Sequence, residues 1–354
     1  MEGEKKMINQ FYKERNIKPS TQKGYNRVVD LYTQYHQKKL NELLEEAITQ
    51  ENTIPNKKER AIKQRLLQFR THLLNTTKYT RKTIILYMKK INTIYNHFDI
   101  ETPKLPAIGI KDEYETSYFD LPNKEHIKMA LRVADPQIQA VILFISSSGT
   151  GLSEVANLTI RDFLQATGEY HNTPQITQQN IHEIIEKLYS YPHQIVPTFY
   201  IQRQKTGKYY YTFCNNEATR KILQLLHKKD DITLNDKLFD LSRRQIQDRI
   251  RVINDKLEFG FKGKYRFFRP HTLRKYHASN IGLSEEHIDM IQGRSKDEVH
   301  ETYIKANPIE LKKIYMNVMD NININIQNDD IINHQEFNIT INVMIMGSDF
   351  GISI

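Results

Sequence analysis

The residues best suited to chemistry on a phosphate lie in the last third of the chain, where two short motifs precede a tyrosine. The first motif, Arg-Pro-His-Thr-Leu-Arg at residues 269–274, places His271 and Arg274 on one face of a helical turn. The second motif, Gln-Gly-Arg, ends at Arg294, and Tyr303 follows it. A guanidinium group is always charged and binds two oxygens at once, so these arginines suit a phosphate group. A phenol beside such cations is a candidate nucleophile.

A lysine in a predicted β-hairpin adds a candidate proton donor. Two segments rich in aromatic and β-branched residues, 198–204 and 208–213, flank the junction Lys-Thr-Gly-Lys, and its glycine predicts a hairpin turn. Lys205, in this turn, carries its ammonium group on a flexible stem, which suits donation of a proton to a leaving oxygen. A charged hairpin tip is by itself more often a solvated turn, so this assignment depends on the motifs around it.

The order and spacing of these motifs resemble those of the tyrosine recombinases, the phage-type integrase family. Members of this family carry, in the second half of the chain, an arginine, a lysine, His-x-x-Arg, a glycine followed by histidine or arginine, and a tyrosine. The resemblance covers roughly residues 115–320. It implies a mainly α-helical fold with a small antiparallel β-sheet, in which an N-terminal helical domain clamps DNA and a tyrosine-recombinase catalytic domain follows.

The resemblance also implies a role for each residue. Tyr303 would attack a DNA phosphodiester and take the 3′-phosphate, and the released 5′-hydroxyl would later attack the phosphotyrosine. Arg274 and Arg294 would stabilise charge on the non-bridging oxygens. Lys205 would donate a proton to the leaving oxygen, and His271 would assist proton transfer at the phenol. Because the covalent link conserves the bond energy, neither a metal nor a cofactor is expected.

One position departs from the family pattern. The family's usual Gly-Leu-Arg-x-Ser-Glu aligns with residues 149–154, which places Gly151 where the first catalytic arginine is expected. Glu154 fits the pattern, and the resemblance implies that it supports the catalytic residues without contacting the substrate. Three interpretations of the gap remain open: a weakened enzyme, a substitute cation such as Arg161, Arg294 or a partner's arginine, or a protein that only binds DNA. By analogy with removal of one preorganised donor, the loss costs ~10²–10³ in rate.

Composition agrees with a nucleic-acid partner. The chain has 354 residues, enough for two domains, and 51 Lys and Arg against 42 Asp and Glu give it a net charge of +9. A basic balance of this kind favours a polyanion, which the resemblance identifies as double-stranded DNA. The single cysteine, Cys214, excludes an internal disulfide and a metal site with several thiolates. No stretch approaches the ~20 apolar residues of a membrane span, so we expect a soluble, cytoplasmic protein.

The pattern of residues predicts two domains joined by a linker. Residues 1–100 contain three amphipathic helical segments with Lys and Arg on their outer faces, typical of a basic helical module; a solvated helical bundle is the alternative. Lys82 and Lys89 are candidate DNA contacts on this module. Residues 101–120 are rich in proline and lack periodicity, so we expect an interdomain linker that acts as a hinge.

The catalytic domain is expected at residues 121–320. Most of it reads as helices, including a nearly all-apolar one at 138–145, whereas 168–191 is polar and of uncertain order. A predicted helix at 242–257 offers contacts to the DNA backbone through Arg243 and Arg244.

The residues after Tyr303 contain a competing phenol and a tail of different character. Tyr315 lies beside Ile314 and Val318, so we expect it to pack rather than to react. The tail, residues 321–354, alternates Asn and Ile in places, which predicts either a strand exchanged with another protomer or a disordered segment.

Three functions share these features. The first is a site-specific recombinase that integrates or excises a mobile element, assembled as a homotetramer on DNA. The second is a recombinase homologue that binds DNA but cleaves it weakly or not at all, because Gly151 replaces the first catalytic arginine. A type IB topoisomerase shares the chemistry, but the small basic N-terminal module favours a recombinase.

Overall fold

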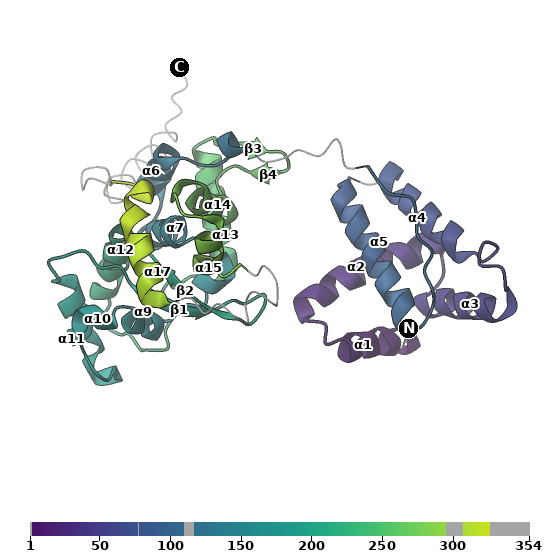
Figure 1. The fold of residues 1–354 in the computed structure, drawn as a ribbon, viewed down its shortest axis with the longest axis horizontal. Helices are drawn as coiled ribbons and strands as arrows, with labels where there is room; N and C mark the ends of the chain where they lie inside the picture. The colour runs from purple at the N-terminus through teal and green to yellow at the C-terminus, as the bar shows by residue number, and fades with distance from the viewer. Residues whose placement is uncertain (1, 77, 110–116, 295–306, 326–354) are drawn as a thin grey trace, which may run out of the picture. The chain divides into compact units, whose positions relative to one another are not determined.

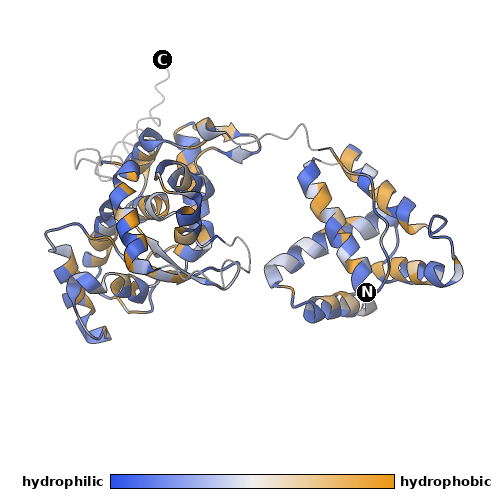
Figure 2. Ribbon diagram, in the orientation of Figure 1, coloured by the Kyte–Doolittle hydropathy of each residue, from blue (hydrophilic) through white to orange (hydrophobic). Residues whose placement is uncertain are grey.

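The computed structural model describes residues 2–76, 78–109, 117–294 and 307–325 (Figure 1). The chain divides into two compact units, Met1–Glu115 and Thr116–Ile354. Each unit has a hydrophobic core of its own. Hydrophobic and hydrophilic residues are interleaved along the helices of both units, as expected for helices that pack one face on a core (Figure 2).

The N-terminal unit is a helical bundle. Apolar residues three or four apart place Val28 and Tyr32 of one helix and Ile91 and Tyr95 of another in its core, where the two phenol oxygens lie 2.9 Å apart in a hydrogen bond. The sequence predicts α2, α4 and α5 but not α1 or α3. The described helices are α1 (Glu2–Glu14), α2 (Pro19–His36), α3 (Leu40–Thr53), α4 (Ile62–Thr76) and α5 (Arg81–His97).

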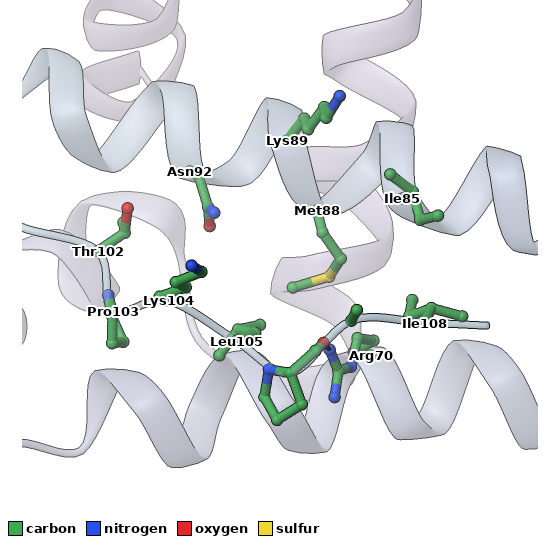
Figure 3. Close-up of a pocket in the computed structure, with 12 residues that line it drawn as sticks. Arg70, Ile85, Met88, Lys89, Asn92, Thr102, Pro103, Lys104, Leu105 and Ile108 are labelled. Atoms are coloured by element: carbon green, nitrogen blue, oxygen red, sulfur yellow. Dashed lines mark hydrogen bonds between the residues drawn. The ribbon is translucent and has the colours of Figure 1, made fainter.

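The segment that follows α5 is held against the N-terminal unit. Arg70 on α4 donates from Nη1 to the carbonyl oxygen of Pro106 at 2.5 Å, and Leu105 packs on the core of this unit. Figure 3 shows this stretch of chain running alongside α5, close to Met88. The linker expected at residues 101–120 is therefore shorter in the structure, because its first nine residues belong to the N-terminal unit.

The C-terminal unit is also mainly helical, with two small antiparallel sheets, so the predicted fold class is confirmed. Strand β1 pairs with β2 from Thr198↔Phe213 to Gln202↔Tyr209, as the sequence predicts, and β3 pairs with β4. The strands are β1 (Thr198–Gln202), β2 (Tyr209–Phe213), β3 (Phe261–Lys262) and β4 (Tyr265–Arg266). The helices are α6 (Lys124–Val133), α7 (Pro136–Ser148), α8 (Leu152–Val155), α9 (Ile160–Ala166), α10 (Gly168–His171), α11 (Ile181–Tyr189), α12 (Asn216–His227), α13 (Arg243–Lys256), α14 (Pro270–Asn280), α15 (Glu285–Ile291) and α17 (Pro308–Val318), with short 3-10 helices η1 (Tyr118–Asp120), η2 (Gln178–Asn180) and η3 (Met319–Ile322).

Helix α7 forms the centre of this unit. Every residue from Ile138 to Ser148 is buried, and α7 packs against both α12 and α14. Asp135 caps its first turn and Pro136 opens it, which is where a proline costs no backbone hydrogen bond. The helix ends at Gly149 in the left-handed conformation, with φ of 64°. The buried apolar helix predicted from the sequence is therefore confirmed.

In the C-terminal unit the structure answers one question that the sequence left open and corrects one expectation. The polar stretch 168–191 is ordered into helices, and α11 buries Ile184 and Leu188 at helical spacing. Residues 321–325, expected to begin the tail, belong to the folded unit instead, because Ile322 and Ile324 are buried in its core. The backbone N–H of Ile324 also donates to Glu217 Oε2 at 2.7 Å. Residues 326–354, on which the strand prediction falls, lie outside the described residues.

Candidate active site

Arg274 is the centre of the candidate site. It lies on α14 and is only 8% exposed, and its guanidinium group donates to two carbonyl oxygens from distant parts of the chain. Nη1 lies 2.6 Å from Gly149 O, at the end of α7, and Nη2 lies 2.9 Å from Gln292 O, at the end of α15. The side chain therefore ties the ends of two helices together and is itself fixed in one orientation.

A buried polar cluster supports Arg274. The Gln292 amide nitrogen lies 3.3 Å from the carbonyl oxygen of Arg274 and 2.9 Å from Nδ1 of His277, which is fully buried. A Cβ atom added at Gly149 would lie 2.4 Å from the same amide nitrogen. Glycine is thus required at position 149 for two reasons, its positive φ and this close approach. Sequence reasoning missed Gln292 and His277 as supports of the site.

Burial keeps His277 neutral. Desolvation, followed by the charges of Arg274 and Arg294, lowers the pKa of His277 from 6.5 to about 3. Between about pH 6.5 and pH 3 the unfolded chain therefore binds a proton that the folded chain does not, so the free energy of unfolding falls as the pH drops through this window.

This pH dependence can be measured with one variant. We expect His277→Asn, which keeps a hydrogen-bond acceptor but does not titrate, to reduce the slope of unfolding free energy against pH by about 1.4 kcal/mol per pH unit between pH 6 and 4. Urea denaturation of both proteins at several pH values gives the two slopes, and the other histidines contribute equally to both. Equal slopes would mean that His277 is protonated in the folded chain.

A second guanidinium group, from Arg203, reaches the same cluster. Arg203 follows β1, and its Nη1 donates to Gln292 O at 2.8 Å, the carbonyl oxygen that Arg274 also contacts. Burial, followed by the charge of Arg203, lowers the pKa of Arg274 to about 10, which leaves it protonated at neutral pH. Sequence reasoning missed Arg203, although its place two residues before Lys205 in the predicted hairpin was the signal that could have identified it.

Glu154 lies behind the site, on α8. Its Oε1 accepts a hydrogen bond from the backbone N–H of Gln204 at 3.0 Å. Its Oε2 lies 2.4 Å from where a Cβ atom of residue 151 would be, so the carboxylate occupies the space that a side chain at Gly151 would enter. Glu154 therefore connects α8 to the hairpin immediately before Lys205, and Lys205 itself is exposed at the turn.

Arg294 and His271 lie at the more exposed edge of the cluster. Nη1 of Arg294 lies 3.6 Å from Asp289 Oδ1, and the arginine side chain is 40% exposed. Partial desolvation, with the nearby cations of Arg269 and Lys275 and then of Arg274 and Arg294, lowers the pKa of His271. His271 is thus neutral at pH 7 and available to accept a proton.

Of the two tyrosines considered as nucleophile, only Tyr315 lies within the described residues. Tyr315 is fully buried on α17, packs against Phe213, and donates from its hydroxyl to Ser147 O at 3.0 Å. Burial raises the pKa of its phenol well above 10. It packs as the sequence predicts. Tyr303 lies in the segment 295–306, outside the described residues.

The cations expected to contact DNA are exposed on their own units. Lys82 and Lys89 are exposed on α5 of the N-terminal unit, and Arg243 is exposed in the first turn of α13. The side chain of Arg244 is 92% exposed, with a weak ion pair to Asp248 at 3.7 Å. All four side chains are therefore accessible to solvent.

In the described parts of the chain, no three His, Cys, Asp or Glu side chains are grouped so that they could hold a metal ion. None of the helices described above is long and apolar enough to cross a membrane.

No protein-family model and no curated protein matches this sequence. Solved structures do match. The Tn1549 transposon integrase in complex with transposon right end DNA has a TM-score of 0.52 at 11% identity, covering 88% of this chain and 97% of that one. A lambda integrase dimer bound to a core site has a TM-score of 0.51 at 11% identity, covering 86% of this chain and 94% of that one. This chain therefore has the fold of the tyrosine recombinases.

Proposed function

We propose that this protein is a site-specific DNA recombinase that cuts and rejoins DNA through a 3′-phosphotyrosine intermediate. One observation carries the proposal: within this fold, the buried guanidinium group of Arg274 is fixed between Gly149 O and Gln292 O, with the guanidinium of Arg203 on the same carbonyl. A preorganised pair of cations suits a phosphate whose negative charge increases as the reaction proceeds.

The proposed reaction needs only side chains of this protein. The phenol oxygen of Tyr303 forms a bond to the phosphorus, and its proton passes to the neutral His271. The bond from phosphorus to the 5′-oxygen breaks, and that oxygen takes a proton from Lys205. Arg274 and Arg294 stabilise the additional charge on the non-bridging oxygens. A 5′-hydroxyl from another strand then attacks the phosphotyrosine and reverses these transfers.

Double-stranded DNA is the proposed substrate. Two solved structures that share this fold are of integrases bound to transposon right end DNA and to a core site. The net charge of +9 and the exposed cations Lys82, Lys89, Arg243 and Arg244 support binding to the phosphate backbone. We propose that the protein integrates or excises a mobile element and that it works as a homotetramer on DNA.

The second candidate is a protein that binds DNA without cutting it. Gly151 favours it, because no arginine stands at the family's first position and the Glu154 carboxylate fills the space there. The two candidates differ in one measurable product, a covalent bond between protein and DNA.

A suicide substrate tests for this product. The DNA is nicked close to the cleavage site, so that the short fragment carrying the 5′-hydroxyl diffuses away and cannot reverse the reaction. We expect the wild-type protein to form an adduct that survives denaturing electrophoresis, and peptide mass analysis to place the bond on Tyr303. Tight binding to the same DNA without any adduct would support the second candidate instead.

A further inference from the structure

The site lacks an arginine at position 151, and the structure shows what occupies its place. The Glu154 carboxylate lies where a side chain on Gly151 would begin, and its other oxygen is held by the backbone N–H of Gln204. The space next to Arg274 on this side is therefore filled by an anion. A cation that replaces the missing arginine must reach the phosphate from another direction.

Arg203 approaches from the hairpin. Nη1 of Arg203 and Nη2 of Arg274 both donate to Gln292 O, at 2.8 and 2.9 Å. These two nitrogen atoms therefore lie no farther apart than the sum of the two distances. Two positive charges at this separation repel each other unless an anion lies near both. Arg274 is buried, and the carbonyl dipoles of Gly149 and Gln292 together with the Glu154 carboxylate offset only part of the two charges.

The backbone of Arg203 is also held firmly. Its N–H donates to Lys208 O at 2.7 Å, and its C=O accepts from the N–H of Gly207 at 2.7 Å. These two bonds close the turn that carries Lys205. Gly207 has φ of 80°, which allows the chain to turn there. One rigid hairpin thus positions both a guanidinium group at its base and the ammonium group of Lys205 two residues farther on.

We propose that Arg203 supplies the guanidinium group that Gly151 lacks, and that it binds the same scissile phosphodiester as Arg274. The inference rests on the proposed function. Arg203 and Arg274 bring two positive charges, of which the Glu154 carboxylate offsets one, so a positive charge remains to bind a phosphodiester. During attack by the phenol the phosphate gains a second negative charge, and two guanidinium groups with several N–H donors stabilise it more than one can.

Three substitutions of Arg203 separate charge from structure. We expect Arg203→Ala and Arg203→Gln to slow adduct formation on the suicide substrate by ~10²–10³, because both remove the cation. Arg203→Lys keeps the charge and is expected to retain more activity than either. Arg161→Ala removes another arginine of this unit that was considered as a substitute for residue 151, and we expect it to react at the wild-type rate.

A second measurement distinguishes a role at the phosphate from a role in folding. In a substrate with a methylphosphonate at the scissile position, one charged oxygen is replaced by a methyl group, so one cation fewer is needed. The difference in rate between wild type and Arg203→Ala is expected to shrink at least ~10-fold on this DNA, since the lost stabilisation is electrostatic. A purely structural defect would slow both substrates equally, and that result would overturn the inference.

The outcomes also separate this inference from the proposed function. An adduct formed equally fast by wild type, Arg203→Ala and Arg203→Gln would overturn the role of Arg203 and leave the recombinase proposal intact. If the wild-type protein forms no adduct on either DNA, both proposals fail.

Discussion

Replacing Tyr303 by phenylalanine is expected to abolish the covalent adduct with suicide DNA while leaving DNA binding unchanged. The substitution removes only the hydroxyl oxygen that would bond to phosphorus, and no step of the proposed reaction can start without it. Adduct formation is followed on denaturing gels, and affinity is measured by fluorescence anisotropy with the same duplex. We expect no adduct even when the variant is incubated ~1,000 times longer than the wild-type protein needs to form one.

Tyr315→Phe is the matched control, because it removes the same atom from the other candidate phenol. The Tyr315 hydroxyl donates to Ser147 O inside the core, so its loss is expected to cost about 0.5–1.5 kcal/mol of stability and no activity. The opposite pattern, with Tyr315→Phe inactive and Tyr303→Phe active, would show that the nucleophile had been assigned to the wrong residue.

The parts of the fold that were predicted correctly are those specified by local pattern. An unbroken apolar run identified α7, and a lysine-glycine junction between two aromatic segments identified the β1–β2 hairpin. The order of 168–191 was not predicted, because α11 is a short helix whose apolar face becomes evident only against α12. The linker was placed too early, because a proline-rich segment gives no sign that Arg70 binds the carbonyl of Pro106.

The candidate site was predictable only in part, for a similar reason. His271 and Arg274 share a helical turn, so their spacing in the sequence already brings them together. Gln292 and Arg203 join them through contacts between segments far apart in the chain. His277 lies three residues after Arg274 on the same helix, and its role becomes evident only from its contact with Gln292. The sequence motifs therefore identified the cations. The residues that hold these cations in place could be identified only from the structure.

Arg274 both holds the site together and contacts the phosphate in the proposed reaction. Its replacement by alanine is therefore expected to reduce both stability and activity. The substitution leaves the carbonyl oxygens of Gly149 and Gln292 without this donor. Gln292 O keeps its hydrogen bond from Arg203, whereas Gly149 O loses its donor. A buried polar group without its partner costs about 1–3 kcal/mol, so we expect the free energy of unfolding to fall by about that amount. Loss of the buried cation is expected to slow adduct formation by at least ~10³, the upper range for one preorganised donor.

Arg274→Lys separates the two effects. Lysine keeps the charge, but its single ammonium group lacks the planar fork with which arginine binds two carbonyl oxygens at once. We therefore expect a stability between those of the wild type and Arg274→Ala, measured by urea denaturation, and an adduct rate still reduced at least ~10²-fold. Wild-type rate and stability in Arg274→Lys would mean that the charge alone is needed, and that the bridge between Gly149 and Gln292 does not set the geometry of the site.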